Sequence, residues 1–393
     1  MSEALKAASK HPDIEAALLR VSQSREGVRA EEGAWFPQIG IFAEYDPQRT
    51  YTMPMNGKTS VIDDDGWSAG ATLRQRVYDF SRTSYRVDAA RIKERIAALS
   101  ADDAKALMRY QVRNSYAQIV VRQEAIKARR SDLEAKKAMY KEALALVKQG
   151  LKTRADALRF KSAMDLARSD LAMAGAALSS AVASLEQLTG RRIAADTSFE
   201  TRFLYKGVFP AGKAAVEKLL KKNISIRVAR KNAQSTHASY KATVAERYGS
   251  IDIVGDITHL DTLTGYDSKT LGIRYSAPIY QGGALSARSE QARVQEMIDA
   301  RKVESLKRKI IEEYRGLYAD WQALGSSIKA QKARISSAKE ALNLIEARYK
   351  EGLSTYIDVL DAQATLLDAR LGLLNAYFQR RNRLDRVEYL YGN

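Results

Sequence analysis

The chain has 393 residues, a formal charge of +17, 6 prolines, 22 glycines and no cysteine. The missing cysteine excludes disulfides, thiolate metal sites and a cysteine nucleophile. Few helix breakers among many Ala, Leu, Lys, Arg, Glu and Gln residues favour long helices over a sandwich or a doubly wound sheet. The charge would suit an anionic partner, but Lys and Arg alternate with Glu and Asp along helical stretches. We therefore interpret the Lys and Arg residues as parts of solvated helix faces, and we expect no nucleic-acid partner.

The N-terminus and the hydropathy leave two compartments open. No run approaches the roughly 20 apolar residues of a membrane-spanning helix. The start, Met1 to Lys6, lacks the basic and apolar regions of a signal peptide. The simplest expectation is a soluble cytoplasmic protein. The alternative is a mature domain whose export signal was removed and replaced by Met1, and the strands favour this alternative.

The first elements combine helix and strand periods. Residues 2–32 predict a helix, interrupted at His11-Pro12. After Trp35 the apolar residues alternate with polar residues or Gly, which predicts a strand over about 35–46. A polar loop is predicted from Asp46 to Gly66, and a second alternating strand over about 67–77.

A long helix follows. Residues 81–148 contain no internal Gly or Pro, so the helix would be roughly 100 Å long at about 1.5 Å per residue. A glycine-containing tip at 149–152 leads to a helix over 153–188. The segment 191–212 breaks the helical pattern and links two halves of the chain.

The second half repeats this order. It predicts a helix over 213–247, strands over about 249–260 and 269–279, a helix over 284–350, a tip at 351–354 and a final helix over 355–390. At an offset of 202 residues the sequences match at several positions: Gly70 with Gly272, Tyr78 with Tyr280, Gly150 with Gly352, Asp156 with Asp358, and Gly190 with Gly392. A tandem duplication explains the match, with repeats at 1–190 and 213–393 and a linker at 191–212.

The second long helix carries a narrow apolar seam with alternating spacings of four and three residues, which is typical of coiled-coil packing. The seam comprises Ile310, Tyr314, Leu317, Trp321, Leu324, Ile328, Gln331, Ile335, Ala338, Leu342, Ile345 and Tyr349. The last helix would return antiparallel and pack on it through Leu360, Leu367, Leu371, Leu374 and Phe378. Charged, Ala-rich flanks remain, so lateral assembly into a larger helical wall is expected.

The four strands have one apolar and one polar face, with aromatic residues near both ends. This is the length and pattern of membrane β-strands that face lipid outside and water inside. Four strands are too few to close a barrel, and an open edge in lipid leaves backbone groups unsatisfied. Several chains would therefore share one barrel. The alternative is a soluble four-stranded sheet packed on helices.

The sequence resembles the TolC family of outer-membrane efflux proteins. The resemblance covers essentially the whole chain and is carried by the duplicated layout and three motifs: Gln75-Arg-Val-Tyr-Asp-Phe80, Tyr275-Ser-Ala-Pro-Ile-Tyr-Gln-Gly-Gly283, and Tyr349-Lys-Glu-Gly352 followed by Asp358-Val-Leu-Asp361-Ala362. It implies an α+β membrane protein: a homotrimer with a shared 12-stranded outer-membrane barrel and a long periplasmic α-helical barrel, in a Gram-negative bacterium. Residues 191–212 would form a belt around the tunnel.

The resemblance also implies a gate. Asp358 and Asp361 would form an acidic ring at the periplasmic mouth, which favours cations, and Tyr349 would help to hold the inner hairpin shut by hydrogen bonding. From pattern alone, Asp358 could instead cap the last helix, and Tyr349 ends the apolar seam. Ser354 stands where the best-known member has an arginine.

The two tips resemble the motifs that meet a periplasmic adaptor. They are Gly150-Leu151 and Gly352-Leu353, and their glycines are equally suited to end a helix.

No sequence feature indicates enzyme chemistry. The three histidines, His11, His237 and His259, have no ligand spacing, and there is no phosphate-binding glycine loop. Met53-Pro54-Met55 is interpreted as an ordinary loop and not as a copper site. We expect no catalytic residue, no metal and no cofactor.

The predicted function is a passive trimeric exit duct for efflux, including antibiotic efflux, or for type I secretion. An adaptor and an inner-membrane RND or ABC transporter would open it at the tip. The alternative is a soluble coiled-coil scaffold or adaptor that binds acidic partners.

Overall fold

The computed structural model describes residues 1–194, 197, 199–261 and 265–393, with Met53 and Met55 described by their backbone only. Contacts divide the chain into two compact units. Unit 1 comprises Met1–Ala17, Ala101–Ile226 and Leu306–Asn393, and unit 2 comprises Leu18–Ser100 and Arg227–Ser305. Each unit takes segments from both halves of the sequence, so the boundary at 191–212 and the tandem duplication stay predictions. The predicted loop at 261–268 and the linker at 191–212 each include residues outside the described part.

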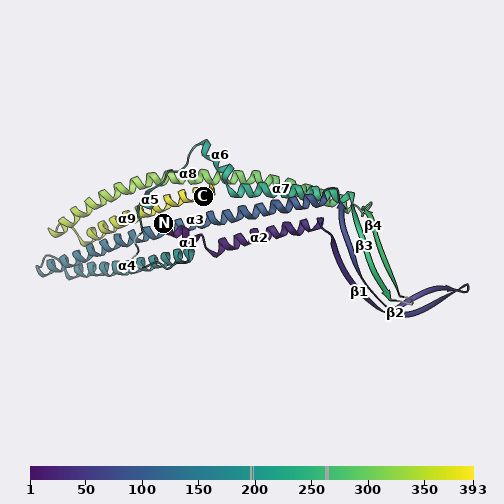
Figure 1. Cartoon of the computed structure of the whole chain (residues 1–393). Coiled ribbons are helices and arrows are strands. Elements are labelled where there is room, and N and C mark those ends of the chain that lie inside the picture. Colours follow the sequence, from purple (N-terminus) through teal and green to yellow (C-terminus); the bar gives the residue numbers. More distant parts are fainter. Residues whose placement is uncertain (195–196, 198, 262–264) are drawn as a thin grey trace. The chain divides into compact units, whose positions relative to one another are not determined.

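Unit 2 holds the sheet and the helices that lead into it (Figure 1). Its elements are most of α2 (Pro12–Glu32), η1 (Gly33–Trp35), β1 (Gln38–Met55), β2 (Lys58–Tyr78), the first part of α3 (Arg82–Lys148), α7 (Ile224–Ala245) except its first turn, which belongs to unit 1, η2 (Glu246–Tyr248), β3 (Ser250–Asp261), β4 (Tyr266–Ser276) and the first part of α8 (Ala284–Lys350). The strands form one antiparallel sheet in the order β1-β2-β3-β4.

The first hairpin is longer than predicted. Residues 46–66 do not form a loop, because β1 and β2 stay paired, with a bulge between Asp46 and Arg49, up to the turn at Asn56-Gly57. Both turn residues have positive φ, 49° and 75°, as a two-residue hairpin turn requires. The polar composition of this stretch concealed the strand, although Asn-Gly is itself a strong hairpin signal.

Unit 1 contains the remaining helices and the main apolar clusters. They are α1 (Ser2–Ala8), the later parts of α3 and α8, α4 (Arg154–Thr189), α5 (Arg202–Tyr205), α6 (Lys213–Lys222) and α9 (Tyr356–Leu390). The single helix predicted over 213–247 is wrong, because the chain breaks at Asn223 between α6 and α7. The Asn223 side chain accepts a hydrogen bond from the Ile226 amide at 3.1 Å and donates to the Leu390 carbonyl at 2.9 Å, so it caps α7 and ties it to α9.

The seam of α8 is confirmed, since each of its residues is buried or half-buried. The residues predicted to face it from α9 are partly wrong. Ala362 and Leu366 of α9 pack against Ala338 and Leu342 of α8. Leu371, Leu374 and Phe378 instead line a pocket of about 480 Å³ with α3 and α4. Ala362 is not part of the pattern of leucines, so the sequence interpretation missed its place in this cluster.

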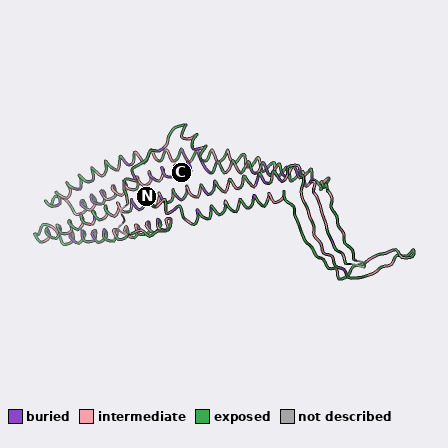
Figure 2. Tube along the Cα trace, viewed as in Figure 1, coloured by how far each residue is buried: buried purple, intermediate pink, exposed green. Residues whose placement is uncertain are grey.

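One helix qualifies as a membrane span by length and composition. The 36-residue α4 contains a window with a mean hydropathy of 1.2, and only 11% of this window is buried. We expected no run of this kind from the sequence and missed it. A single window of this kind is weak evidence of a span. In Figure 2 the outer strands β1 and β4 are also mostly exposed, so apolar surface is left uncovered in both units.

Candidate gate and membrane surface

The two predicted tips have the same backbone structure. At the first, the Leu151 amide donates to the Leu146 carbonyl and the Gly150 amide to the Val147 carbonyl, at 2.9 and 3.1 Å. At the second, Leu353 and Gly352 make the equivalent bonds at 2.8 and 3.1 Å. These are Schellman motifs, which require the left-handed φ of 78° and 80° that the glycines adopt. Each tip glycine is therefore needed to end its helix.

Each tip then begins its second helix with a capping box. Thr355 accepts from the Asp358 amide, and the Asp358 carboxylate accepts from the Thr355 amide and hydroxyl, both at 2.8 Å. Thr153 and Asp156 form the same box on α4. These hydrogen bonds lower the pKa of Asp358 below that of an ordinary carboxyl. Asp358 is thus a helix cap, and it is also exposed.

The two tips meet in one apolar cluster. Helices α3, α4, α8 and α9 contribute Met139, Ala143, Leu146, Ala157, Phe160, Tyr349 and Val359 to it. The rings of Phe160 and Tyr349 pack edge to face at 5.5 Å. Separating the two hairpins would expose this cluster to water, so the cluster favours the joined arrangement.

Tyr349 lies at the centre of this contact. Its side chain has no exposed surface, and burial raises its pKa to about 12. Its hydroxyl oxygen has no hydrogen-bond partner within the described residues, so packing and not a hydrogen bond fixes the ring here. The predicted role of Tyr349 in the gate stays a prediction.

Lys152 connects the tips by a second route, which the sequence interpretation missed. Its ammonium group donates to the Ser354 carbonyl at 3.2 Å and lies 4.9 Å from the centre of the Tyr349 ring. Lys152 occupies the position in the first half that matches Ser354 in the second at the offset of 202. A cation therefore lies next to Ser354, contributed by the other tip.

The remaining predicted tip residues point to solvent. Leu151 and Leu353 are 64% and 65% exposed, although the corresponding apolar residue of a Schellman motif often packs back on its helix. Asp361 is exposed, one turn beyond Asp358 on α9. The structure thus brings Tyr349 into the tip cluster and leaves Asp358, Asp361 and the two leucines accessible.

The sheet has two distinct faces. Large apolar side chains are exposed on one of them: Ile39, Ile41, Tyr45, Trp67, Ile257, Leu271, Ile273 and Tyr275. The other face carries the ion pair between Arg74 and Asp252, with an N–O distance of 2.7 Å. Such an exposed apolar face is costly in water and suits contact with lipid.

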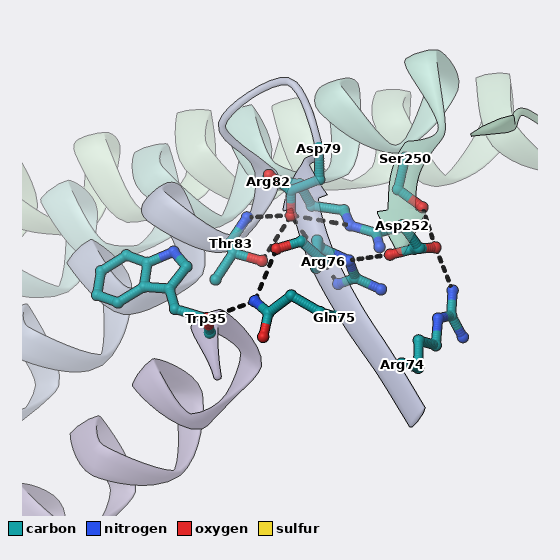
Figure 3. A network of polar contacts seen from close by, with 9 residues as sticks. All are labelled: Trp35, Arg74, Gln75, Arg76, Asp79, Arg82, Thr83, Ser250 and Asp252. Atoms are coloured by element: carbon teal, nitrogen blue, oxygen red, sulfur yellow. Dashed lines mark hydrogen bonds and ion pairs between the residues drawn. The ribbon is translucent and has the colours of Figure 1, made fainter. Parts of the chain in front are cut away.

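A polar network fixes the junction of β2 and α3 (Figure 3). Arg76 contacts both Asp252 and Asp79, and Asp79 accepts from the Thr83 amide and hydroxyl at 2.9 and 2.5 Å. Phe80 and Ser81, between them, have positive φ of 56° and 67°, which is unfavourable for residues other than glycine. The Asp79 contacts offset this strain and hold the strand against the helix.

No metal-binding group is present among the described side chains. They contain no group of three or more His, Asp and Glu residues that could hold a metal ion. His237 and His259 instead contact Glu296 and Asp267, each at 2.8 Å.

Comparison with known proteins agrees with this geometry. The family model "Outer membrane efflux protein" matches residues 5–191 and 215–393. The chain belongs to the outer membrane efflux protein family. It is 23% identical to outer membrane protein TolC of Vibrio cholerae over 92% of this chain and 84% of that protein. It is 24% identical to TolC of Escherichia coli over 93% and 75%.

Solved structures share the fold. A CusC structure superposes with a TM-score of 0.83 at 20% identity and covers 98% of this chain and 91% of its own. The outer membrane protein VceC of Vibrio cholerae gives a TM-score of 0.82 at 17% identity, with 100% and 95% covered. The fold is therefore TolC-like, with long helices and four strands per chain, and membership of the family makes this an outer-membrane efflux protein of the Gram-negative type.

Proposed function

We propose that the chain forms a homotrimeric passive exit duct whose three sheets join into one 12-stranded barrel. The exposed apolar face of the sheet carries this proposal. The edges at β1 and β4 have unpaired backbone groups that lipid cannot satisfy. Pairing β1 of one copy with β4 of the next removes the edges. Family membership favours this duct over the soluble scaffold suggested by the charge.

The duct closes at its helical tips in the periplasm. In each chain the apolar cluster around Tyr349 and the Lys152 contact hold the α8–α9 hairpin against the α3–α4 hairpin. Opening separates the hairpins, so it requires a partner that compensates the exposed apolar surface. That partner is an adaptor, which docks on the exposed Leu151 and Leu353 next to Gly150 and Gly352 and connects the duct to an inner-membrane pump of the RND or ABC type.

The acids near the second tip select the ions that pass the closed mouth. Asp358 and Asp361 are both exposed and lie one turn apart on α9, so three copies would place six carboxylates around the axis. Because the capping box lowers the pKa of Asp358, its carboxylate keeps its charge to a lower pH than an ordinary carboxyl. Such a ring attracts cations, and multivalent cations most strongly.

Conductance in planar bilayers tests the duct and its ring. The wild-type protein should form cation-selective pores that multivalent cations block, and Asp361→Asn should weaken both properties. Asp361 is the better target because Asp358 also caps α9. Asp165→Asn, which removes an exposed acid from α4, is the matched control and should behave as the wild type. A protein that stays monomeric and forms no pores would disprove the duct; pores with unchanged selectivity would show that the ring lies elsewhere.

A further inference from the structure

A basic groove lies between α3 and α7 in unit 2. Its volume is about 580 Å³, and its lining includes four cationic side chains, Arg91, Arg95, Lys231 and Lys241, together with His237, which contacts Glu296. Asp88 is the one acid among the described lining residues. The groove therefore carries an excess of positive charge, which attracts anions.

Three of these cations have no carboxylate partner in the part of the chain that the structure describes. Lys231 donates to the Gln234 amide oxygen at 2.9 Å, and Lys241 lies 5.7 Å from the centre of the Tyr85 ring. Arg95 is exposed and forms no ion pair there. In contrast, Arg91 pairs with Glu32 at 2.8 Å. Arg95, Lys231 and Lys241 are thus available to a negatively charged ligand.

The network at the start of α3 identifies the face on which the groove opens. Arg74 and Arg76 reach Asp252 from the polar face of the sheet, and Arg82 lies within 4.0 Å of Asp79 in the same network (Figure 3). The helix face that begins at Arg82 is therefore continuous with the polar face of the sheet.

The groove lies on another side of α3. Arg86 and Lys93 continue the Arg82 face and line a smaller pocket of about 210 Å³. Tyr85 and Arg95, which line the basic groove, lie roughly a quarter and roughly half of a turn away from them around α3, at ~3.6 residues per turn. The groove consequently opens toward the side of the apolar face of the sheet, which is the side that meets lipid.

The groove begins at the depth of lipid headgroups. Tyr85 and Arg95 follow the helix start at Arg82 by 3 and 13 residues, which is roughly 5 and 20 Å at ~1.5 Å per residue. The headgroup layer beyond the hydrocarbon is about 5–8 Å thick on each side. Tyr85, with Lys241 next to it, therefore lies at headgroup level, and the rest of the groove lies just outside the membrane.

The groove is also distant from the sheet edges. Helix α3 leaves β2 and α7 leads to β3, and these are the two central strands. Neighbouring copies would join at the outer strands β1 and β4, so they would leave the groove open.

We propose that this groove binds the phosphate of an anionic glycerophospholipid in the periplasmic leaflet of the outer membrane. Lys241 contacts the phosphate, Lys231 and Arg95 extend the positive surface away from the membrane, and the acyl chains lie on the apolar face of the sheet. The site anchors unit 2 at a fixed depth in the membrane. It depends on the location in the outer membrane and not on the gate or the cargo.

Native mass spectrometry of the purified oligomer, titrated with phosphatidylglycerol or phosphatidylcholine of the same acyl chains, tests the proposal. The wild type should bind phosphatidylglycerol at least tenfold more tightly. Each cation near a membrane surface raises the affinity for an anionic lipid roughly fivefold. The triple variant Arg95→Gln/Lys231→Gln/Lys241→Gln should therefore bind phosphatidylglycerol at least tenfold more weakly than the wild type, and its affinity for phosphatidylcholine should change little. Lys241→Gln alone, which changes one exposed side chain, should lower the affinity for phosphatidylglycerol roughly fivefold.

The matched control neutralises three cations away from the groove: Arg86 and Lys93 of the smaller pocket, and Lys302, which lines a neighbouring pocket of about 460 Å³ together with Lys93 (Arg86→Gln/Lys93→Gln/Lys302→Gln). It should keep the wild-type affinity for phosphatidylglycerol. Equal binding of the two lipids by the wild type would overturn the proposal. So would equal losses in the groove variant and the control, because attraction by the total charge would then account for binding.

Discussion

At the scale of single residues, Tyr349 combines a buried ring with an unpaired hydroxyl. Its burial was predicted from the seam of the long helix, because a residue at that spacing must face the partner helix. The hydrogen bond implied by the family resemblance is absent from the described contacts. A buried hydroxyl without a partner loses its hydration and gains nothing in return, so Tyr349 contributes through its ring.

Tyr349→Phe should leave stability at neutral pH unchanged or slightly higher, because it removes an unsatisfied polar atom. The raised pKa adds a dependence on alkaline pH. Between pH 10 and 12 the unfolded chain releases the Tyr349 proton while the folded chain keeps it, so the contribution of Tyr349 to stability is lost as pH rises through this window. Phenolate absorbance measured against pH should therefore show one tyrosine per chain that titrates near 12 and disappears in the variant.

Tyr356→Phe, which alters a neighbouring ring packed against the same cluster, should leave this titration in place. Persistence of the titration in Tyr349→Phe would show that another tyrosine is responsible.

The roles of the other tip residues were predicted from the sequence only where they depend on local contacts. Gly150, Gly352 and the capping acids act within one helical turn, so local spacing was sufficient. Lys152 was missed because its contact with Ser354 joins two hairpins that are distant in sequence. The reach of a long side chain across such a contact depends on how the hairpins pack, which no local pattern contains.

At the scale of elements, Arg381 of α9 contacts the segment around α5 and forms a buried ion pair within α9. Arg381 binds Asp385 through two hydrogen bonds of 2.9 and 2.5 Å and donates to the Lys206 carbonyl at 2.9 Å. Its guanidinium carbon lies 4.0 Å from the centre of the Phe203 ring. Burial raises the pKa of Asp385, although Arg381 opposes the shift. The pair orients Arg381, whose contacts with Lys206 and Phe203 hold α5 against α9 in unit 1.

Asp385→Ala should be strongly destabilising because it leaves Arg381 buried without its counter-ion. Removing one partner of a buried pair typically costs about 3–5 kcal/mol of the free energy of unfolding. Thermal unfolding in detergent measures the loss, and hydrogen exchange should increase first in Arg202–Tyr205. Asp368→Ala on the same helix removes an acid from an exposed pair with Arg334 and should cost less than about 1 kcal/mol. Equal losses in the two variants would contradict the role of burial.

The elements themselves show which sequence signals were reliable. Helices α3 and α8 each have 67 residues and were predicted nearly to their ends, because neither contains proline and each is followed by a glycine that stops it. The extension of the first hairpin was missed because its side chains are mostly polar. Strand pairing there depends on the Asn56-Gly57 turn and on the partner strand, whereas the apolar alternation marks only the part of the hairpin that faces lipid.

At the scale of the whole molecule, the sheet ends at two exposed edges, β1 and β4. Hydrogen bonds across the edges would satisfy backbone groups that lipid cannot. In β1 and β4 apolar residues alternate with polar ones. When β1 of one copy pairs with β4 of the next, the apolar residues of both strands therefore lie on the same face of the joined sheet. Because the chain has no cysteine, introduced cysteines are its only thiols. Disulfide cross-linking between them can therefore test the edge pairing.

Ile41→Cys on β1, combined in turn with Leu271→Cys, Ile273→Cys or Tyr275→Cys on β4, should give disulfide-linked dimers and trimers on oxidation in membranes. All four positions lie on the exposed apolar face, and steps of two residues along β4 cover the registers that an antiparallel edge pair allows. Ile41→Cys combined with Ile257→Cys on the central strand β3 is the control and should stay unlinked between chains, because β2 and β4 separate β3 from both edges. Denaturing electrophoresis without reductant distinguishes the outcomes. If none of the β4 positions links to Ile41→Cys, the edges do not pair between copies and the shared barrel is wrong, whereas a linked ladder from one register fixes how neighbouring sheets join.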